Sequence, residues 1–243
     1  MNLQPIYCDR IETVRFPAPV ALSYKLGSEY INHPLTQALE GLYDLFPGAK
    51  REIENAGLIW TNDPLGKPYL SQSTNADLPF SVPDIQVSNS HDGAWSLVAV
   101  SCSIAILSIG IDIVHLPRLA HKSKDYLIRL ASKFMSRDEH TGFLHSADGL
   151  RDTEFRKLFA THFSMMEAAS KALGTGLKIG MGIGARGGLP MTSIGMHHSK
   201  NGLQLSLGHA AKARLTEIGG NSILCANYDS NDSVVCLTAV TLD

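Results

Sequence analysis

Apolar residues recur at helical spacing in three stretches of the chain, and this spacing predicts three helices. The first covers 34–46 and stops at Pro47, which cannot continue a helix. The second covers 126–134. The third and longest runs over about 153–173, where Gly174 is expected to end it.

A short fourth helix is expected after Ser136, because Glu139 stands three residues on as the partner of a capping box. Other stretches are rich in β-branched residues and are bounded by turn residues, which is typical of strands. The last two of these are expected to pair as a hairpin across Asp229 to Ser233. The predicted strands are 85–90, 95–101, 104–114, 203–208, 222–228 and 234–240.

The segment between the first helix and the first strand is rich in turn residues. Asparagine, aspartate, proline and glycine in TNDPLGKPYL, residues 61–70, predict that this piece has no regular structure. Residues 71–84 are polar and punctuated by proline, so they are predicted to form a loop.

The two halves of the chain share a pattern. QVSNSHDGAWSLVAV and ILCANYDSNDSVVCLTAV each place a turn rich in aspartate before an alternating strand. The predicted fold is α+β, a pseudo-dimer of two similar halves, each a small antiparallel sheet packed on a long helix. The expected boundaries are 1–108 for the first half and 109–243 for the second.

Composition narrows the function classes. Hydrophobic residues make up 44% of the 243 residues and charged residues 18%, which excludes a disordered chain. A net charge of −2 and a pI of about 6.5 provide no basic footprint for nucleic acid. The longest apolar stretch is interrupted by serines and Asp112, so no membrane span is expected. Four cysteines without a short spacing, and a start without signal-peptide character, predict a cytoplasmic protein.

Two acidic residues stand in apolar surroundings. Asp112 lies within the apolar run SIGIDIV, and buried acids are costly unless they are paired or bind a metal. Glu167 is flanked by apolar and small residues on the longest helix, and Lys171 shares its face. Two such carboxylates would suit Mg²⁺, and a nearby lysine would suit phosphate. The alternatives are an acid at a strand end for Asp112 and an ordinary surface ion pair for Glu167 with Lys171.

The segment NSHDG, residues 89–93, follows a predicted strand. Ser90 and His91 offer hydroxyl and imidazole groups to a phosphate. The alternative interpretation is a capped turn, because these residue types all favour turns.

Taken together and in order, these motifs resemble the 4′-phosphopantetheinyl transferase superfamily. The motifs that carry the resemblance are GKP at 66–68, SNSHD at 88–92, IGID at 109–112, FMSRDE at 134–139 and MEAASKALGTG at 166–176. The total length is similar to the two-halved surfactin-activating type, whereas the last motif is closer in wording to the short carrier-protein synthases.

The resemblance implies an enzyme that moves the phosphopantetheine arm of coenzyme A onto a serine of an acyl or peptidyl carrier protein. Asp112 and Glu167 would hold Mg²⁺, and Glu167 would help to deprotonate the serine hydroxyl. Lys171 would contact phosphate. Lys67, Ser90 and His91 would contact the nucleotide end of coenzyme A. A pseudo-dimer of this kind is expected to be a monomer in solution.

Two positions depart from the family pattern. Val114 stands where two-halved relatives usually carry a third acid, and Met166 stands where the family usually carries a lysine. Glu139 matches an acid near the metal site of two-halved members. The alternative function is therefore a non-catalytic or weakly active relative that binds coenzyme A.

Three other signals have simple explanations. GIGARG at 182–187 matches a dinucleotide fingerprint, but Pro190 follows too soon for the required helix. His197 and His198 lack a third metal ligand at suitable spacing and are interpreted as a surface pair. The lysines at 122 and 124 would suit an acidic carrier protein, or equally a solvated helix start.

Overall fold

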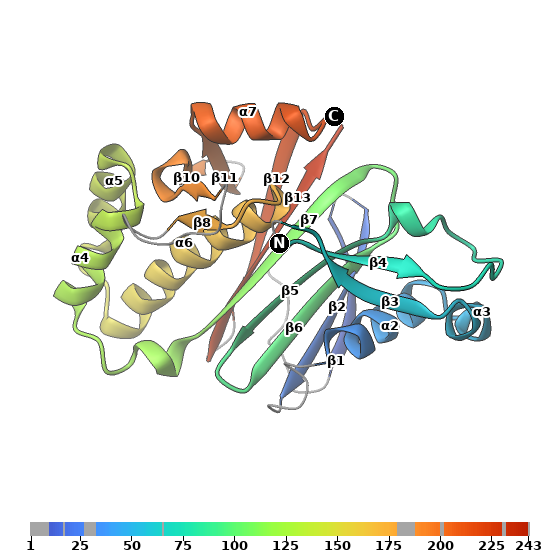
Figure 1. Ribbon diagram of the computed structural model, residues 1–243. Helices are drawn as coiled ribbons and strands as arrows, with labels where there is room; N and C mark the ends of the chain where they lie inside the picture. The colour runs from blue at the N-terminus through green and yellow to red at the C-terminus, as the bar shows by residue number, and fades with distance from the viewer. Residues whose placement is uncertain are drawn as a thin grey trace.

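The chain folds into four layers, helix on sheet on sheet on helix (Figure 1). The first layers consist of helix α2 on an antiparallel sheet of order β1-β2-β6-β5. The elements of this half are β1 (Arg10–Arg15), β2 (Pro19–Leu26), α2 (Pro34–Leu45), α3 (Lys50–Asn55), β3 (Leu58–Asn62), β4 (Pro68–Gln72), β5 (Gln86–Asp92) and β6 (Trp95–Ser101). The computed structural model describes residues 10–16, 18–26, 33–64, 66–178, 188–199, 202–229 and 232–242.

The second half places the long helix α6 across an antiparallel sheet of order β12-β13-β7. Two further helices and a separate hairpin, β10-β11, surround α6. The elements are β7 (Ile106–His115), α4 (Lys124–Phe134), α5 (Arg137–Ala147), α6 (Asp152–Ala172), β8 (Leu177–Lys178), β9 (Leu189–Pro190), β10 (Ile194–Ser199), β11 (Gly202–Leu207), α7 (His209–Glu217), β12 (Ser222–Asp229) and β13 (Ser233–Thr241).

Strand alternation assigns each face of the sheets to a different core. On β7, Ile109 and Ile111 enter the core between the two sheets, whereas Val114 joins the core beneath α6. On β6, Leu97 enters the core between the sheets and Val98 the core beneath α2. The predicted α+β fold, with a small sheet and a helix in each half, is confirmed. The predicted boundary between residues 108 and 109 falls within β7 and stays a prediction.

Most predicted elements are confirmed with shifts of one or two residues at their ends. Helix α2 ends at Leu45, and α6 ends just before Gly174, whose φ of 69° favours glycine. Strands β12 and β13 pair antiparallel, as the predicted hairpin requires. Residues 1–9, including Cys8, and residues 179–187, which include the GIGARG motif, lie outside the described residues.

The prediction for TNDPLGKPYL was wrong. β3 and β4 pair antiparallel and include residues 61–62 and 68–70 of this segment, with Asn62 opposite Pro68. Asp63, Pro64 and Gly66 lie between the strands, where the Asp63 carboxylate accepts the Lys67 N–H at 2.8 Å. They close a hairpin rather than prevent one, and the hairpin fixes the backbone of Lys67.

The two halves meet where the edge strands β5 and β7 run side by side, and we call this contact the seam. No ladder of backbone hydrogen bonds joins these two strands in the described part of the chain. Instead, alternate side chains of β5 accept hydrogen bonds from β7. Ser88 Oγ accepts from Ile111 N at 3.1 Å, Ser90 Oγ from Ile113 N at 3.4 Å, and Asp92 Oδ2 from His115 N at 2.7 Å.

β7 and α6 approach each other at Gly110 more closely than a side chain would permit. A Cβ on Gly110 would stand 1.9 Å from the Ala168 carbonyl oxygen and 2.5 Å from the Ala172 nitrogen. Glycine is therefore required here, and the close approach sets the distance between β7 and the residues that α6 presents to it.

No helix within the described ranges has the length and apolar character to cross a bilayer.

Candidate active site

Asp112 lies on the face of β7 that turns toward α6 and is only 7% exposed. Its Oδ1 accepts hydrogen bonds from Ser90 Oγ at 2.7 Å and from Lys171 Nζ at 2.9 Å. Strand β5, strand β7 and helix α6 thus each contribute one side chain to this cluster. The cost of burying the carboxylate is offset by a cation and a hydroxyl donor.

Lys171 extends from α6 to β7. Besides Asp112, its ammonium donates to the Ile111 carbonyl oxygen at 3.0 Å. The Lys171 ammonium therefore points toward β7. An ordinary surface ion pair with Glu167, which was the alternative interpretation, does not account for these contacts.

Glu167 is half-buried one helical turn before Lys171. Burial raises the pKa of its carboxyl, the negative charge of Asp112 raises it further, and Lys171 opposes both effects. Two carboxylates that repel each other beside one cation form a site in which additional positive charge is favourable.

This pKa direction gives a testable pH dependence. The folded pKa of Glu167 lies above its ordinary value of 4.5, so the folded protein binds more protons than the unfolded chain just above that pH. The free energy of unfolding should therefore fall as pH rises through this window. We expect Glu167→Gln to flatten that fall, as measured by urea unfolding from about pH 4 to about pH 7. An identical pH profile in the variant would contradict the assignment.

The donor set fits Mg²⁺. Mg²⁺ typically binds one or two carboxylates and completes its octahedron with water and phosphate oxygens. Asp112 and Glu167 supply two hard oxygen ligands whose mutual repulsion a divalent ion would relieve. Within the described ranges no group of three or more ligating side chains gathers. The buried Val114 adds no third acid at this place.

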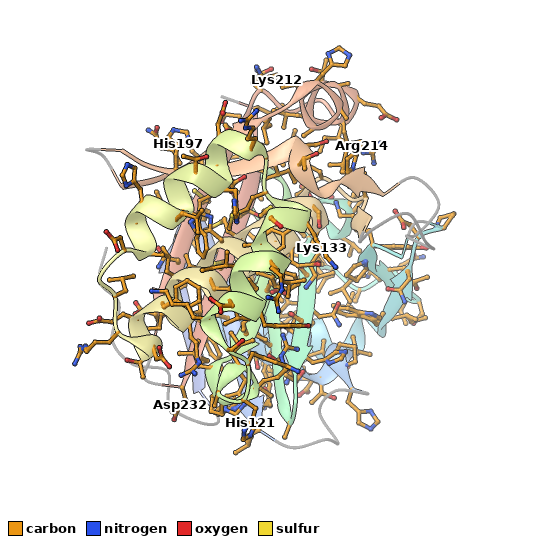
Figure 2. All side chains as sticks on the ribbon, turned by 90° about the vertical axis from the view of Figure 1, so that its left-hand side faces the viewer. His121, Lys133, His197, Lys212, Arg214 and Asp232 are labelled. Carbon is orange, nitrogen blue, oxygen red and sulfur yellow. The ribbon has the colours of Figure 1, made fainter. Side chains whose placement is uncertain are left out.

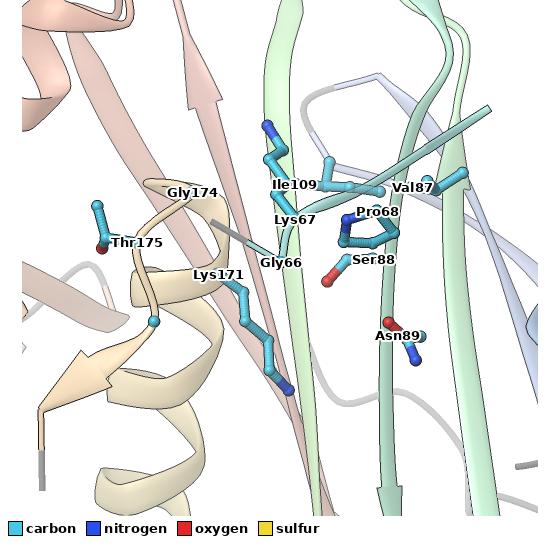
Figure 3. Close-up of a pocket in the computed structure, with 11 residues that line it drawn as sticks. Gly66, Lys67, Pro68, Val87, Ser88, Asn89, Ile109, Lys171, Gly174 and Thr175 are labelled. Atoms are coloured by element: carbon cyan, nitrogen blue, oxygen red, sulfur yellow. The ribbon is translucent and has the colours of Figure 1, made fainter. Parts of the chain in front are cut away.

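A pocket of about 140 Å³ lies beside this cluster (Figure 3). Lys171 enters it from α6, and Lys67 and Pro68 enter it from the start of β4. Ser88 and Asn89 of β5 and the Gly174–Gly176 turn that ends α6 complete the wall. Lysines from both halves of the chain thus line one pocket at the seam, and their ammonium groups point in different directions (Figure 3).

Lys67 is held against the seam, where its Nζ donates to Ser108 Oγ at 2.7 Å. Burial lowers its pKa, Asp63 opposes this effect, and the nearby Arg214 lowers the pKa further. An anion in the pocket would favour the charged form of the Lys67 ammonium and so raise its pKa again.

Arg214 was not found by sequence reasoning. It lies on α7, where its Nε donates to the Leu173 carbonyl oxygen at 2.9 Å. A Cβ added to Gly174 would stand 3.5 Å from Arg214 Nη2 and 3.4 Å from Lys67 Cδ, so both cations border the same turn. No motif surrounds Arg214 in the sequence, and only the docking of α7 reveals its position.

Of the remaining predicted residues, the structure places Ser90 beside Asp112 and places His91 and Met166 elsewhere. Ser90 joins Asp112, but its hydroxyl serves the seam and the carboxylate. His91 is exposed on the opposite face of β5, as strand alternation requires, and is not part of the pocket wall. Met166 is fully buried in the core beneath α6, where its side chain packs against apolar neighbours.

Glu139 lies elsewhere. Ser136 Oγ accepts the Glu139 N–H, which gives half of the predicted capping box. The Glu139 carboxylate turns to β10 instead, where Oε1 accepts the Met196 N–H at 3.0 Å and lies 3.4 Å from His162 Nδ1. Its described contacts therefore do not include Asp112 or Glu167. His197 is exposed on β10, and the side chain of His198 lies outside the described residues.

Comparison with known proteins identifies the family to which this chain belongs. The sequence model of the family described as "4'-phosphopantetheinyl transferase superfamily" matches residues 108–218. The holo-[acyl-carrier-protein] synthase of Buchnera aphidicola subsp. Baizongia pistaciae is 34% identical over 99 residues, which are 41% of this chain and 68% of that protein.

Solved structures of similar proteins include the holo-[acyl-carrier-protein] synthases of Neisseria meningitidis and Helicobacter pylori. The first has a TM-score of 0.45 and 26% identity, and covers 56% of this chain and 98% of its own. The second, in complex with coenzyme A, has a TM-score of 0.40 and 22% identity, and covers 55% of this chain and 99% of its own. On the match to the family and to its curated relative, the chain belongs to the 4′-phosphopantetheinyl transferase superfamily of enzymes.

Proposed function

We propose that this protein transfers the 4′-phosphopantetheine arm of coenzyme A to a serine of an acyl or peptidyl carrier protein. The observation that carries the proposal is the cluster at the seam. There Asp112 bonds to Lys171, Glu167 has a raised pKa, and a pocket with two lysines adjoins them. The family to which the chain belongs performs this class of reaction.

In the proposed reaction, the serine oxygen attacks the β-phosphorus of coenzyme A. A new P–O bond forms to the serine, and the P–O bond to adenosine 3′,5′-bisphosphate breaks. The hydroxyl proton must leave as the bond forms. Glu167 is the proposed acceptor, because its carboxyl group lies beside Asp112 in this cluster.

We assign Asp112 and Glu167 as the residues that hold Mg²⁺. The bound ion would offset negative charge on the phosphate oxygens. Lys171 stands between Asp112 and the pocket and would contact a phosphate as a point charge. Lys67 lines the pocket, Arg214 borders the turn at Gly174 that forms part of its wall, and both would bind the nucleotide end of coenzyme A.

The direct test is to incubate the protein with coenzyme A, Mg²⁺ and a panel of carrier proteins lacking the arm, and to weigh the carriers. We expect at least one carrier to gain the mass of phosphopantetheine, with release of adenosine 3′,5′-bisphosphate. A chelator should stop the reaction. Binding of coenzyme A by calorimetry without transfer to any carrier would favour the alternative, a binding protein that lacks catalysis.

Arg214→Met is expected to raise the KM for coenzyme A on the order of 10-fold while kcat changes little, because one charge-assisted phosphate contact is lost. Lys212→Met is the matched control. Lys212 is exposed on the same helix, and Figure 2 shows the two side chains on different sides of it. Steady-state kinetics with varied coenzyme A measure the effect. Equal KM values for the two variants would remove Arg214 from the site.

We propose further that the chain is of the two-halved, surfactin-activating type, acting as a monomer in the cytoplasm. The support is that both halves of the seam come from one chain, and that Cys102, Cys225 and Cys236 are free thiols. Light scattering of the active protein should give the mass of one chain. An active species found only as a dimer or trimer would overturn this part of the proposal.

A further inference from the structure

Ser90 of β5 holds two neighbouring positions of β7 with a single hydroxyl group. Its Oγ accepts the Ile113 N–H at 3.4 Å and donates to Asp112 Oδ1 at 2.7 Å. A serine hydroxyl has only one hydrogen to donate, and here Asp112 receives it. Because Asp112 and Ile113 are adjacent in the chain, the two bonds together fix the Asp112 carboxylate relative to its own backbone.

The backbone of Asp112 is held separately, by α6. Ser164 is fully buried two helical turns before Lys171, and its hydroxyl donates to the Asp112 carbonyl oxygen at 3.0 Å. Ser90 and Lys171 instead bind the carboxylate. Loss of the Ser90 hydroxyl would therefore release the side chain of Asp112 while α6 still holds its backbone.

Both hydrogen bonds to the Asp112 carboxylate fall on the same oxygen. Ser90 and Lys171 each donate to Oδ1, and no hydrogen bond to Oδ2 is found in the described part of the chain. Oδ2 is also not one of the fully buried side-chain atoms that lack a partner, so it keeps some accessible surface. A carboxylate anchored through one oxygen leaves the other oxygen available to a metal ion, and contacts of this kind orient metal ligands.

Ser90 itself is not placed to contact a ligand in the pocket at the seam. It is only 7% exposed, and the pocket wall includes Ser88 and Asn89 but not Ser90 (Figure 3). Its one donor hydrogen is directed at Asp112, so none remains for a phosphate. The geometry therefore favours a role other than the coenzyme A contact that the sequence resemblance implies for Ser90.

We propose that Ser90 is a positioning residue of the metal site, which orients the Asp112 carboxylate so that Oδ2 can bind Mg²⁺. The first half of the chain thereby supports a site whose two acids, Asp112 and Glu167, both belong to the second half. This inference rests on the proposed function, which assigns Asp112 as a Mg²⁺ ligand. Its test is independent of the transfer reaction, because metal binding is measured without a carrier protein.

The test titrates Mn²⁺ into the full chain and reads free Mn²⁺ from its electron paramagnetic resonance signal. Mn²⁺ prefers carboxylate and water ligands, as Mg²⁺ does. Ser90→Ala should weaken Mn²⁺ binding at least about 10-fold, as is typical when a contact that supports a metal ligand is removed. The affinity for coenzyme A, measured by calorimetry in metal-free buffer, should change little, because Ser90 is not part of the pocket wall.

Ser88→Ala is the matched control. Ser88 is the preceding residue on the same face of β5, and its Oγ accepts the Ile111 N–H at 3.1 Å, but its described hydrogen bonds do not include Asp112. Each variant removes one acceptor from the seam, so urea unfolding should show similar losses of stability. Only Ser90→Ala should weaken Mn²⁺ binding. If Ser90→Ala did not fold, Ser90→Cys would replace it, because a thiol keeps the shape and is a weak donor.

The inference is overturned if the parent chain binds no Mn²⁺, or if Ser88→Ala weakens Mn²⁺ binding as much as Ser90→Ala does. It is also overturned if Ser90→Ala weakens coenzyme A binding and leaves Mn²⁺ binding unchanged, which would make Ser90 a coenzyme A contact and leave the proposed function intact. Weaker Mn²⁺ binding by Ser90→Ala, in a protein whose parent chain modifies no carrier, would support the inference and refute the proposed function.

Discussion

Asp112→Asn is expected to reduce phosphopantetheine transfer on the order of 10²–10³-fold. The amide is nearly isosteric with the carboxylate and still accepts from Ser90, so the fold should persist. The charge that pairs with Lys171 and that is proposed to bind Mg²⁺ is lost. The measurement is the rate of carrier modification as a function of Mg²⁺ concentration.

Asp125→Asn serves as the matched control, because Asp125 lies on the first turn of α4 and not in the cluster. It should retain full activity and an unchanged response to Mg²⁺. If Asp112→Asn kept the parental rate with the same Mg²⁺ dependence, the assigned metal site would be wrong. If it lost activity through unfolding alone, circular dichroism would reveal this, and the milder Ser90→Ala would then be compared for its Mg²⁺ response.

Gly110→Ala is expected to destabilise the fold by about 3 kcal/mol or more. The added Cβ would meet backbone atoms of α6, which cannot rotate away as a side chain could. β7 and α6 would have to separate, and that separation would also move Asp112 relative to Lys171. Urea unfolding measures the loss of stability, and the transfer assay measures the accompanying loss of activity.

Gly142→Ala is the opposite case. A Cβ at Gly142 faces open space within α5, so alanine should stabilise the protein by roughly 0.5–1 kcal/mol through helix propensity. Equal effects of the two substitutions would show that the approach of α6 to β7 at Gly110 is looser than described.

Periodicity was enough to predict α2, α4 and α6 and the strands β5, β6, β7, β11, β12 and β13, because burial of one face imposes a repeat that can be read locally. It gave no prediction for α3, α7, β1, β2 or β10. It failed at residues 61–70, where turn residues occupy only the tip of the β3-β4 hairpin. The short strands beside that tip bury little surface and leave no clear alternation. The contact between β5 and β7 at the seam was also not predicted in detail, since side chains, rather than a ladder, join the two strands.

Most residues of the candidate site could be predicted from the sequence, but their arrangement in space could not. Asp112, Glu167 and Lys171 stand out as polar residues in apolar surroundings, and the structure brings them together. Arg214 gave no signal, because it reaches the site through the docking of α7. Glu139 has a helix-capping position that predicts a local role, yet tertiary packing directs its carboxylate to β10.

The seam also affects whether the chain can pair with strands of other molecules. A strand at the edge of a sheet exposes a row of backbone N–H groups that can recruit a strand from another molecule. On β7 these donors are already taken by Ser88, Ser90 and Asp92 of β5. Because side chains rather than a backbone ladder occupy them, the two sheets do not merge into one. The same residues that hold the site together therefore also protect an edge strand against aggregation.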